Sequence, residues 1–246
     1  MSERPRLFSV PPSVPFLETL VDTLVDGTLV PGFRPQDDPH LLPSATIYLP
    51  TRRSARMLPA IFQKKFGAKP VLLPRIRPVG DADEDVLSLG ASADLAPLPP
   101  AIPLTERHLT MTRLVMAWKG ALRREVLNLR LDEPLGVPAS TADAAWLAAE
   151  LLALMDEIET EEADWSELGS LVPEDFARYW QITLDFLRIV QQAWPAHLAE
   201  QGQMDPKARR SALIRREAKR LAGEASAGPV IVAGVTGSVP ATAELL

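Results

Sequence analysis

A basic string that follows an apolar run is the first place in this sequence where residue type and spacing suggest chemistry. The run Ala45–Pro50 leads directly into Thr51, Arg52, Arg53 and Arg56. Threonine is typical of a helix N-cap, whereas arginine is unfavourable in the first turns because the helix macrodipole is positive there. A bound anion would offset that cost, since amides, hydroxyl and guanidinium groups together can hold phosphate. The string therefore predicts a phosphate-binding helix N-terminus.

Two further arginines, Arg75 and Arg77, follow the next apolar run. We read Val71–Pro74 as a strand, so both arginines are expected just beyond its carboxyl end. Ligands of open parallel sheets bind beyond the carboxyl ends of the strands, which adds this pair to the candidate site. The alternative is that Arg56 pairs with a nearby carboxylate and that the other arginines are merely solvated.

Charge is strongly segregated along the chain, although the net charge is only −6. Residues 45–77 contain eight Lys or Arg and no acid, while residues 131–177 contain thirteen acids and no Lys or Arg. Residues 205–224 turn basic again, with seven Lys or Arg against three acids. Local potential matters more than the sum, so the acidic total does not exclude a polyanionic partner.

The apolar and turn patterns predict an α/β chain with a helical middle. The beginning reads as β-α-β-α-β, which is typical of a parallel sheet with crossover helices. The expected strands are Leu7–Val10, Ala45–Pro50, Val71–Pro74 and Gly228–Gly234. The expected helices are one capped by Ser13 with Pro15 in its first turn, followed by Arg52–Phe66, Leu104–Arg124, Ser140–Thr160, Pro173–Glu200 and one from Pro206 to about Leu221. We expect residues 1–80 to begin the α/β domain, 81–103 to cross, 104–227 to form a helical insertion and 228–246 to return to the sheet.

Several classes of site are disfavoured. The first strand-to-helix loop, Val10, Pro11, Pro12 and Ser13, lacks the glycine and lysine of a phosphate-binding loop, and its prolines remove amides. The chain has no cysteine, so it offers no disulfide and no iron–sulfur ligand. The acidic group Asp81, Asp83, Glu84 and Asp85 reads better as a solvated loop than as a cation site. We therefore expect no catalytic residue, no metal and no cofactor in this chain, and no membrane partner.

Five strings of this sequence resemble one known family. FSVPPSVPFLETL, ATIYLPTRRSARML and LLPRIRPVGDADED resemble the N-terminal region of the AddB family in its alphaproteobacterial form. AddB proteins are double-strand break repair subunits of the AddAB helicase–nuclease. LVPEDFARYWQITLDFLRIVQQAWPAHLAEQGQMDPKARR and GPVIVAGVTGSVPATAELL match the same family in the same order. The resemblance covers essentially the whole chain.

The resemblance implies a RecA-like, superfamily-1 helicase-like fold without a functional P-loop, with an all-helical insertion and a sheet incomplete at the C-terminus. Thr51–Arg53 then matches a motif that touches single-stranded DNA, and Thr236 and Ser238 lie in a loop that faces the DNA channel. The implied partners are an AddA-type subunit, which would drive unwinding with ATP, and single- or double-stranded DNA ends. The implied location is the bacterial cytoplasm, at the nucleoid. The family's nuclease domain, with its iron–sulfur cluster and divalent metal, is expected beyond this N-terminal portion.

Two other functions stay open at this point. A nucleotide-hydrolysing helicase domain would bind ATP at Val10–Ser13. A structural scaffold would use the acidic stretch Leu131–Ala177 to dock a basic surface of an AddA-type subunit. Whether the chain takes part in an enzyme reaction is also left open.

Overall fold

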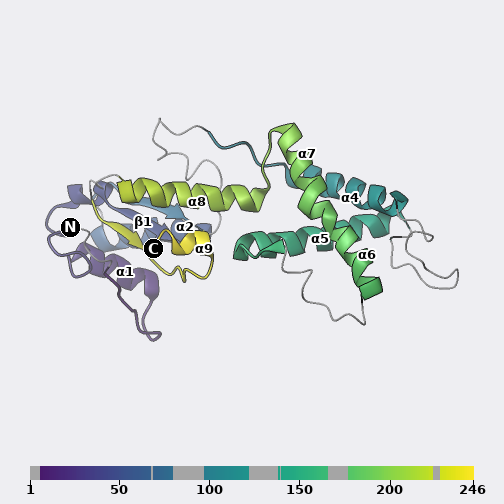
Figure 1. The fold of residues 1–246 in the computed structure, drawn as a ribbon. Coiled ribbons are helices and arrows are strands. Elements are labelled where there is room, and N and C mark those ends of the chain that lie inside the picture. Colours follow the sequence, from purple (N-terminus) through teal and green to yellow (C-terminus); the bar gives the residue numbers. More distant parts are fainter. Residues whose placement is uncertain are drawn as a thin grey trace. The chain divides into compact units, whose positions relative to one another are not determined.

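The chain is α/β and divides into two compact units in a computed structural model (Figure 1). The structure describes residues 6–67, 69–79, 97–121, 138, 140–165, 177–223 and 228–246. Unit 1 comprises residues 1–95 and 210–246, and unit 2 comprises residues 96–209. Residues 81–96 of the expected crossing, and with them the acidic group at 81–85, lie outside the described residues.

A small parallel sheet forms the centre of unit 1. Strands β1 (Thr46–Leu49), β2 (Arg75–Pro78) and β3 (Val230–Val232) pair in the order β2-β1-β3. All four residues of β1 are buried, as expected for the central strand of a parallel sheet that is covered on both faces. The α/β class expected from the sequence is confirmed, with a sheet that is open.

Two of the expected strands are wrong. Residues 71–74 form no strand. The pairing with β1 begins at Arg75, whose amide donates to the Ala45 carbonyl at 2.9 Å. Residues 7–10 also form no strand. Leu72 is 69% exposed and Leu7 is 98% exposed, so neither apolar run enters the core. A short apolar run does not reveal which backbone it will pair with, because that depends on distant residues.

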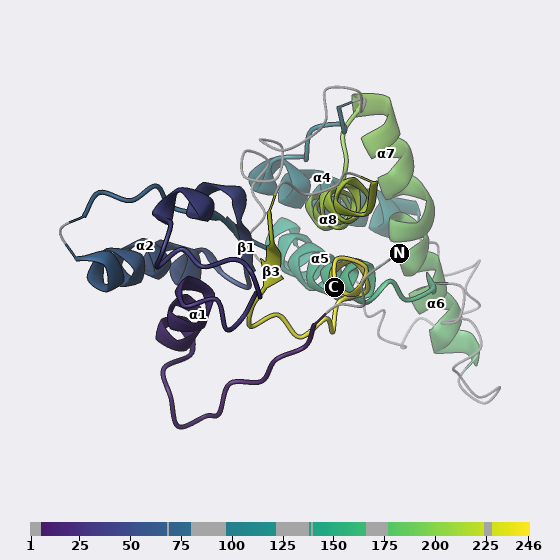
Figure 2. The same cartoon turned by 90° about the vertical axis from the view of Figure 1, so that its left-hand side faces the viewer.

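Helices cover both faces of this sheet. Helices α1 (Phe16–Val25) and α2 (Arg52–Phe66) cover one face, and α8 (Pro206–Gly223) covers the other (Figures 1 and 2). The first face is sealed by buried side chains of the two helices and β1: Val21, Leu24, Ile47, Leu49, Leu58 and Phe62. A 3-10 helix, η1 (Pro39–Ser44), precedes β1, and a short helix, α9 (Pro240–Ala243), follows β3.

The N-caps of the helices agree with the local sequence signals at most positions and differ at one. Thr51 is an N-cap as expected, and Ser140, the first residue of an expected helix, is one too; each accepts from the amide three residues later at 3.1 Å. Asp205 caps α8 by accepting from the Lys207 amide at 3.1 Å. The expected cap Ser13 is wrong: α1 begins at Phe16, with Pro15 in the N-cap position and no side-chain cap.

Unit 2 is helical. Its helices are α4 (Leu104–Ala121), α5 (Thr141–Glu161), α6 (Ala177–Arg188) and α7 (Trp194–Gln201). A π-helical turn, η4 (Ile189–Ala193), joins α6 to α7 within the single helix expected there. Pro195 explains the turn, because proline has no amide to donate and its ring crowds the carbonyl four residues earlier. The unit boundary falls inside α8 at Arg210, whereas the helical insertion was expected to continue to residue 227.

Candidate nucleic-acid interface

The N-terminus of α2 lies where β1 ends, and it is closed by a capping box. The Ser54 amide donates to Thr51 Oγ1 at 3.1 Å, and the Thr51 amide donates to Ser54 Oγ at 3.3 Å. Such a reciprocal pair satisfies two helix-end donors within the chain. Thr51, an expected phosphate ligand, is therefore already used by its own helix, and its contribution is to hold the first turn in place.

The arginines in the first two turns of α2 are in different situations. Arg53 and Arg56 are exposed, and within the described part of the chain neither forms a salt bridge. Arg52 is half-buried and makes an interaction of its own. Positive charge at a helix N-terminus is unfavourable by about 0.3–1 kcal/mol. Arg53 and Arg56 are therefore the two guanidinium groups at this end that remain available for an anion.

The loop after β3 reaches the same edge of the sheet. Strands β1 and β3 are parallel neighbours, so Thr51 and the Gly234–Ser238 loop both follow carboxyl ends. A Cβ at Gly234 would lie 3.3 Å from the Phe16 ring and 3.7 Å from Pro50 Cδ, and Gly234 has a φ of +70°. The positive φ favours glycine at this position, and a side chain there would also press on the Phe16 ring. The close approach brings the loop against the segment that precedes α2.

Thr236 and Ser238, which the family resemblance implies as DNA contacts, are both exposed in this loop. Their hydroxyl oxygens lie 3.1 Å apart. The N-terminal part of α2, with Arg53 and Arg56, and the loop with Thr236 and Ser238 each follow the carboxyl end of a strand, and these strands, β1 and β3, are parallel neighbours. We call these four residues the carboxyl-edge site.

The second arginine pair does not join this site, and the expectation that it follows a strand is wrong. Arg75 begins β2 opposite Thr46, so it lies at the amino edge of the sheet. Arg77 is inside β2, only 7% exposed, and its Nη1 donates to Glu217 Oε1 at 2.6 Å. Because the strand lies four residues later than predicted, one arginine moves to the opposite edge and the other moves into the interior.

Glu217 of α8 is the residue that the sequence analysis missed. It also accepts from the Tyr48 hydroxyl and from Arg220 Nε, the latter at 2.8 Å. Burial acts to raise the pKa of Glu217, but hydrogen bonds from Arg220 and Tyr48 and the charge of Arg77 outweigh it and lower the pKa. Burial and the hydrogen bond to Glu217 raise the pKa of Tyr48 to about 12. Glu217 lies on a helix dense in Lys and Arg, and nothing in the sequence indicated that its carboxylate would pair with Arg77 of β2.

The lysines of α2 also find acids that are distant in sequence. Lys65 Nζ lies 2.6 Å from Asp22 Oδ1, and Lys64 Nζ lies 3.5 Å from Glu18 Oε1, both on α1. Lys69 is exposed beyond the C-terminal end of α2. Lys69 and Arg56 both line a cavity of about 610 Å³ beside α2. The acid-free stretch of the sequence is thus partly neutralised by α1 and α8. Arg53, Arg56, Lys69 and Arg75 remain exposed at different places on unit 1.

Residues 10–13, expected as the first strand-to-helix loop, lie in a turn that precedes α1 and follow no strand. The Val14 amide donates to the Pro11 carbonyl at 3.2 Å, and Pro11, Pro12 and Ser13 are exposed. Among the described residues, no three His, Asp or Glu side chains are placed to hold a metal ion. Within those same residues, no helix is long and apolar enough to cross a membrane.

Comparisons with protein-family models, with curated proteins and with solved structures found no match. The functional interpretation therefore depends on the carboxyl-edge site and on the sequence strings described above. Two exposed guanidinium groups and two exposed hydroxyls can donate hydrogen bonds to phosphate oxygens. This chemistry suits a polyanionic strand.

Proposed function

We propose that unit 1 binds single-stranded DNA at the carboxyl-edge site. In this proposal the chain is the DNA-binding, ATPase-inactive and helicase-like part of an AddB-type subunit with a RecA-like domain. It acts with an AddA-type subunit on double-strand DNA breaks in the bacterial cytoplasm. The observation that carries the proposal is the pair Arg53 and Arg56, exposed and without a salt bridge among the described residues, at a helix N-terminus.

The position of these arginines supports phosphate binding. A helix N-terminus already favours anions, and arginine adds bidentate hydrogen bonds to phosphate. Without an anion the same arginines oppose the helix macrodipole. Successive phosphates of a strand would offset that cost for both side chains, which lie about one turn apart on α2.

The neighbouring loop supports a strand rather than a single phosphate. Thr236 and Ser238 extend the set of donors along the sheet edge, from the end of β1 to the end of β3. Contacts from hydroxyl and guanidinium groups to phosphate carry little sequence information, so binding is expected to be sequence-independent. The loop 10–13, with two prolines and no lysine, supports the ATPase-inactive part of the proposal.

The test is the salt dependence of single-stranded DNA binding by the full chain. We expect the double variant Arg53→Ala with Arg56→Ala to bind a fluorescein-labelled oligothymidylate more weakly in anisotropy titrations. The slope of log K against log salt should flatten by about 0.7 for each phosphate that the protein no longer binds. Removal of two such phosphate interactions thus predicts a change of about 1.4.

A matched control lies on the same helix. Lys64→Ala with Lys65→Ala removes the same charge, but both lysines face acids of α1. We expect this control to leave the slope nearly unchanged. An equal change in both double variants would show a general charge effect, and no change in the arginine variant would refute the proposal.

A further inference from the structure

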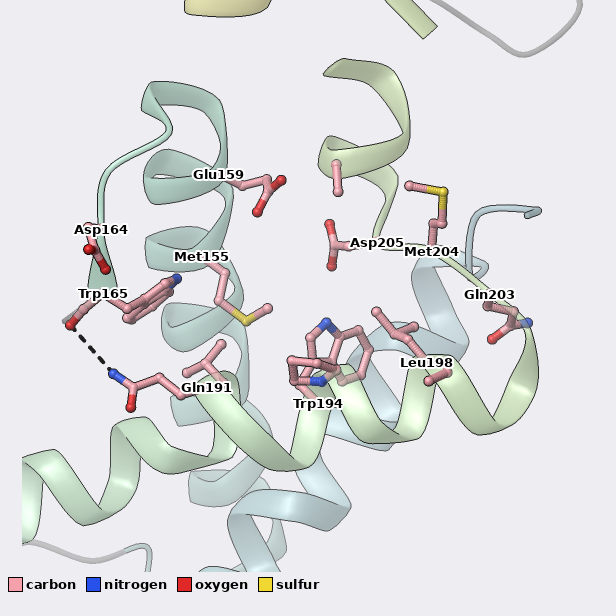
Figure 3. A pocket seen from close by; sticks show the side chains of 14 residues that line it. Met155, Glu159, Asp164, Trp165, Gln191, Trp194, Leu198, Gln203, Met204 and Asp205 are labelled. Atoms are coloured by element: carbon pink, nitrogen blue, oxygen red, sulfur yellow. Dashed lines mark hydrogen bonds between the residues drawn. The ribbon is translucent and has the colours of Figure 1, made fainter. Parts of the chain in front are cut away.

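A second site of different character lies in unit 2. A cavity of about 690 Å³ opens between α5, η4, α7 and the first residues of α8 (Figure 3). Its walls are largely apolar and include Met155, Trp165, Trp194 and Leu198. Glu159 also lines it and points from α5 toward the side of the cavity where Asp205 lies (Figure 3). The cavity is large enough for one large side chain and part of the backbone that carries it.

Trp194 gives this cavity an unmet hydrogen-bond donor. The side chain is only 2% exposed, and its Nε1 has no acceptor among the described residues. Figure 3 shows the indole nitrogen on the side of the cavity where Asp205 lies. A buried N–H without a partner costs free energy, and buried tryptophans usually find an acceptor. A ligand carbonyl next to Trp194 would supply the missing partner.

The π-helical turn builds this wall of the cavity. The Trp194 amide donates to the Ile189 carbonyl, five residues earlier, which rotates the following residues relative to a regular helix. Gln191, in the same turn, donates to the Trp165 carbonyl at 3.5 Å and ties that residue to η4. Single π turns inside α-helices are frequent at functional sites. Here the turn places Trp194 and Gln191 on the cavity side together.

The surroundings of the cavity are acidic. Glu159, Asp164 and Asp205 line the cavity, and none of its lining residues is Lys or Arg. Asp205 is held by Arg107 Nε at 2.9 Å, and Arg107 Nη2 also binds Asp156 at 2.7 Å. The remaining carboxylates that line the cavity, Glu159 and Asp164, are both exposed. This local field attracts cations and disfavours nucleic acid.

We infer that the cavity docks a peptide segment of a partner protein in which one apolar side chain is flanked by Lys or Arg. The apolar side chain enters between Met155, Trp194 and Leu198. A backbone carbonyl of the segment accepts from Trp194 Nε1, and the flanking cations face Glu159 and Asp164. The inference is independent of DNA binding by unit 1, since none of these residues belongs to the carboxyl-edge site.

The probe is a set of fluorescein-labelled peptides, Gly-Lys-Arg-X-Lys-Arg-Gly, with X as Leu, Met, Phe or Trp. Anisotropy titrations with the full chain should show at least one peptide that binds about tenfold more tightly than the peptide with Ser at X, because only the apolar residue can fill the cavity. If no member of the set exceeds the Ser peptide, the inference is wrong, since charge alone then explains the binding.

Two tryptophan variants of α7 test whether the peptide binds in the cavity. Ala199→Trp places a large ring at the exposed mouth of the cavity and should weaken the best peptide about tenfold or more. Ala196→Trp makes the same change on an exposed position of α7 that does not line the cavity, and it should have no effect. Equal affinities of these two variants would overturn the inference even if the peptides bind.

Two further variants test the individual contacts. Trp194→Phe keeps an aromatic ring but removes the N–H, so peptide affinity should fall several-fold while the circular dichroism spectrum is unchanged. Glu159→Gln with Asp164→Asn should weaken binding and reduce its salt dependence, whereas Glu150→Gln with Glu157→Gln, elsewhere on α5, should do so less. An unchanged affinity in both Trp194→Phe and the Glu159 and Asp164 double variant would contradict the proposed contacts.

Discussion

The first turns of α2 and the strand β2 use the same residue type in opposite ways. Arg53 and Arg77 belong to one acid-free stretch of the sequence. Arg53 is exposed at a helix N-terminus, whereas Arg77 is buried and bound to Glu217, which is 140 residues away in the sequence. A run of like charge in a sequence is therefore not a patch of like charge in space.

Burial explains why these two arginines have different partners. A buried charge is costly unless it is paired and hydrogen-bonded, so Arg77 needs the carboxylate of Glu217. An exposed arginine keeps its hydration and needs no protein partner. Of these two arginines, only Arg53 can therefore bind a ligand without first breaking an internal contact.

Loss of Glu217 is expected to have the largest effect on stability. Glu217→Ala leaves Arg77 buried without its carboxylate, which should lower the free energy of unfolding by about 3–5 kcal/mol. Urea unfolding followed by circular dichroism measures it. Glu244→Ala removes the partner of Arg215, a more exposed pair at 2.8 Å, and should cost at most about 1 kcal/mol. Similar losses in the two variants would mean that the Glu217 cluster is not a special feature of the core.

A smaller effect is expected at alkaline pH. Because the pKa of Tyr48 is raised to about 12 in the folded protein, its neutral form stabilises unit 1 below pH 10, and this stabilisation is lost between about pH 10 and 12. We expect the difference in unfolding free energy between the unmodified chain and Tyr48→Phe to shrink over that range. Urea unfolding at several pH values measures it. A difference that stays constant would show that the phenol does not titrate differently in the two states.

The smallest effect, and of opposite sign, is expected at Arg53. Arg53→Ala removes a positive charge from a helix N-terminus and should raise the free energy of unfolding by a few tenths of a kcal/mol. The same variant should bind single-stranded DNA more weakly, so stability and binding move in opposite directions. Unfolding and anisotropy measurements on one preparation test both. A loss of more than about 1 kcal/mol would instead give Arg53 a structural role.

The candidate sites of the two units also differ in the sign of their charge. The carboxyl-edge site of unit 1 offers cations and hydroxyls to a polyanion. The cavity of unit 2 offers aromatic walls and carboxylates to an apolar and cationic peptide. The opposite charges mean that each ligand is disfavoured at the other site.

Local signals in the sequence predicted much of this protein. Helices α2 and α5 and their caps, Thr51 and Ser140, follow from apolar spacing and from a hydroxyl three residues before its amide partner. The central strand β1 follows from a compact apolar run between breaking residues. Arg53 and Arg56 follow the carboxyl end of β1, as the basic string after that apolar run indicated, and their role as contact residues stays a prediction. Each of these features depends on neighbours in the chain or on one simple rule of topology.

Tertiary structure alone decided the rest. The register of β2 turned Arg77 inward and moved Arg75 to the other edge, because strand pairing depends on the backbone of β1 and not on the apolarity of residues 71–74. Glu217 became the partner of Tyr48 and Arg77 because α8 covers that face of the sheet. The cavity beside Trp194 needed three helices and a π turn to form. Hydrogen-bond periodicity is a local property of the chain, whereas burial and charge pairing join residues that are far apart in sequence.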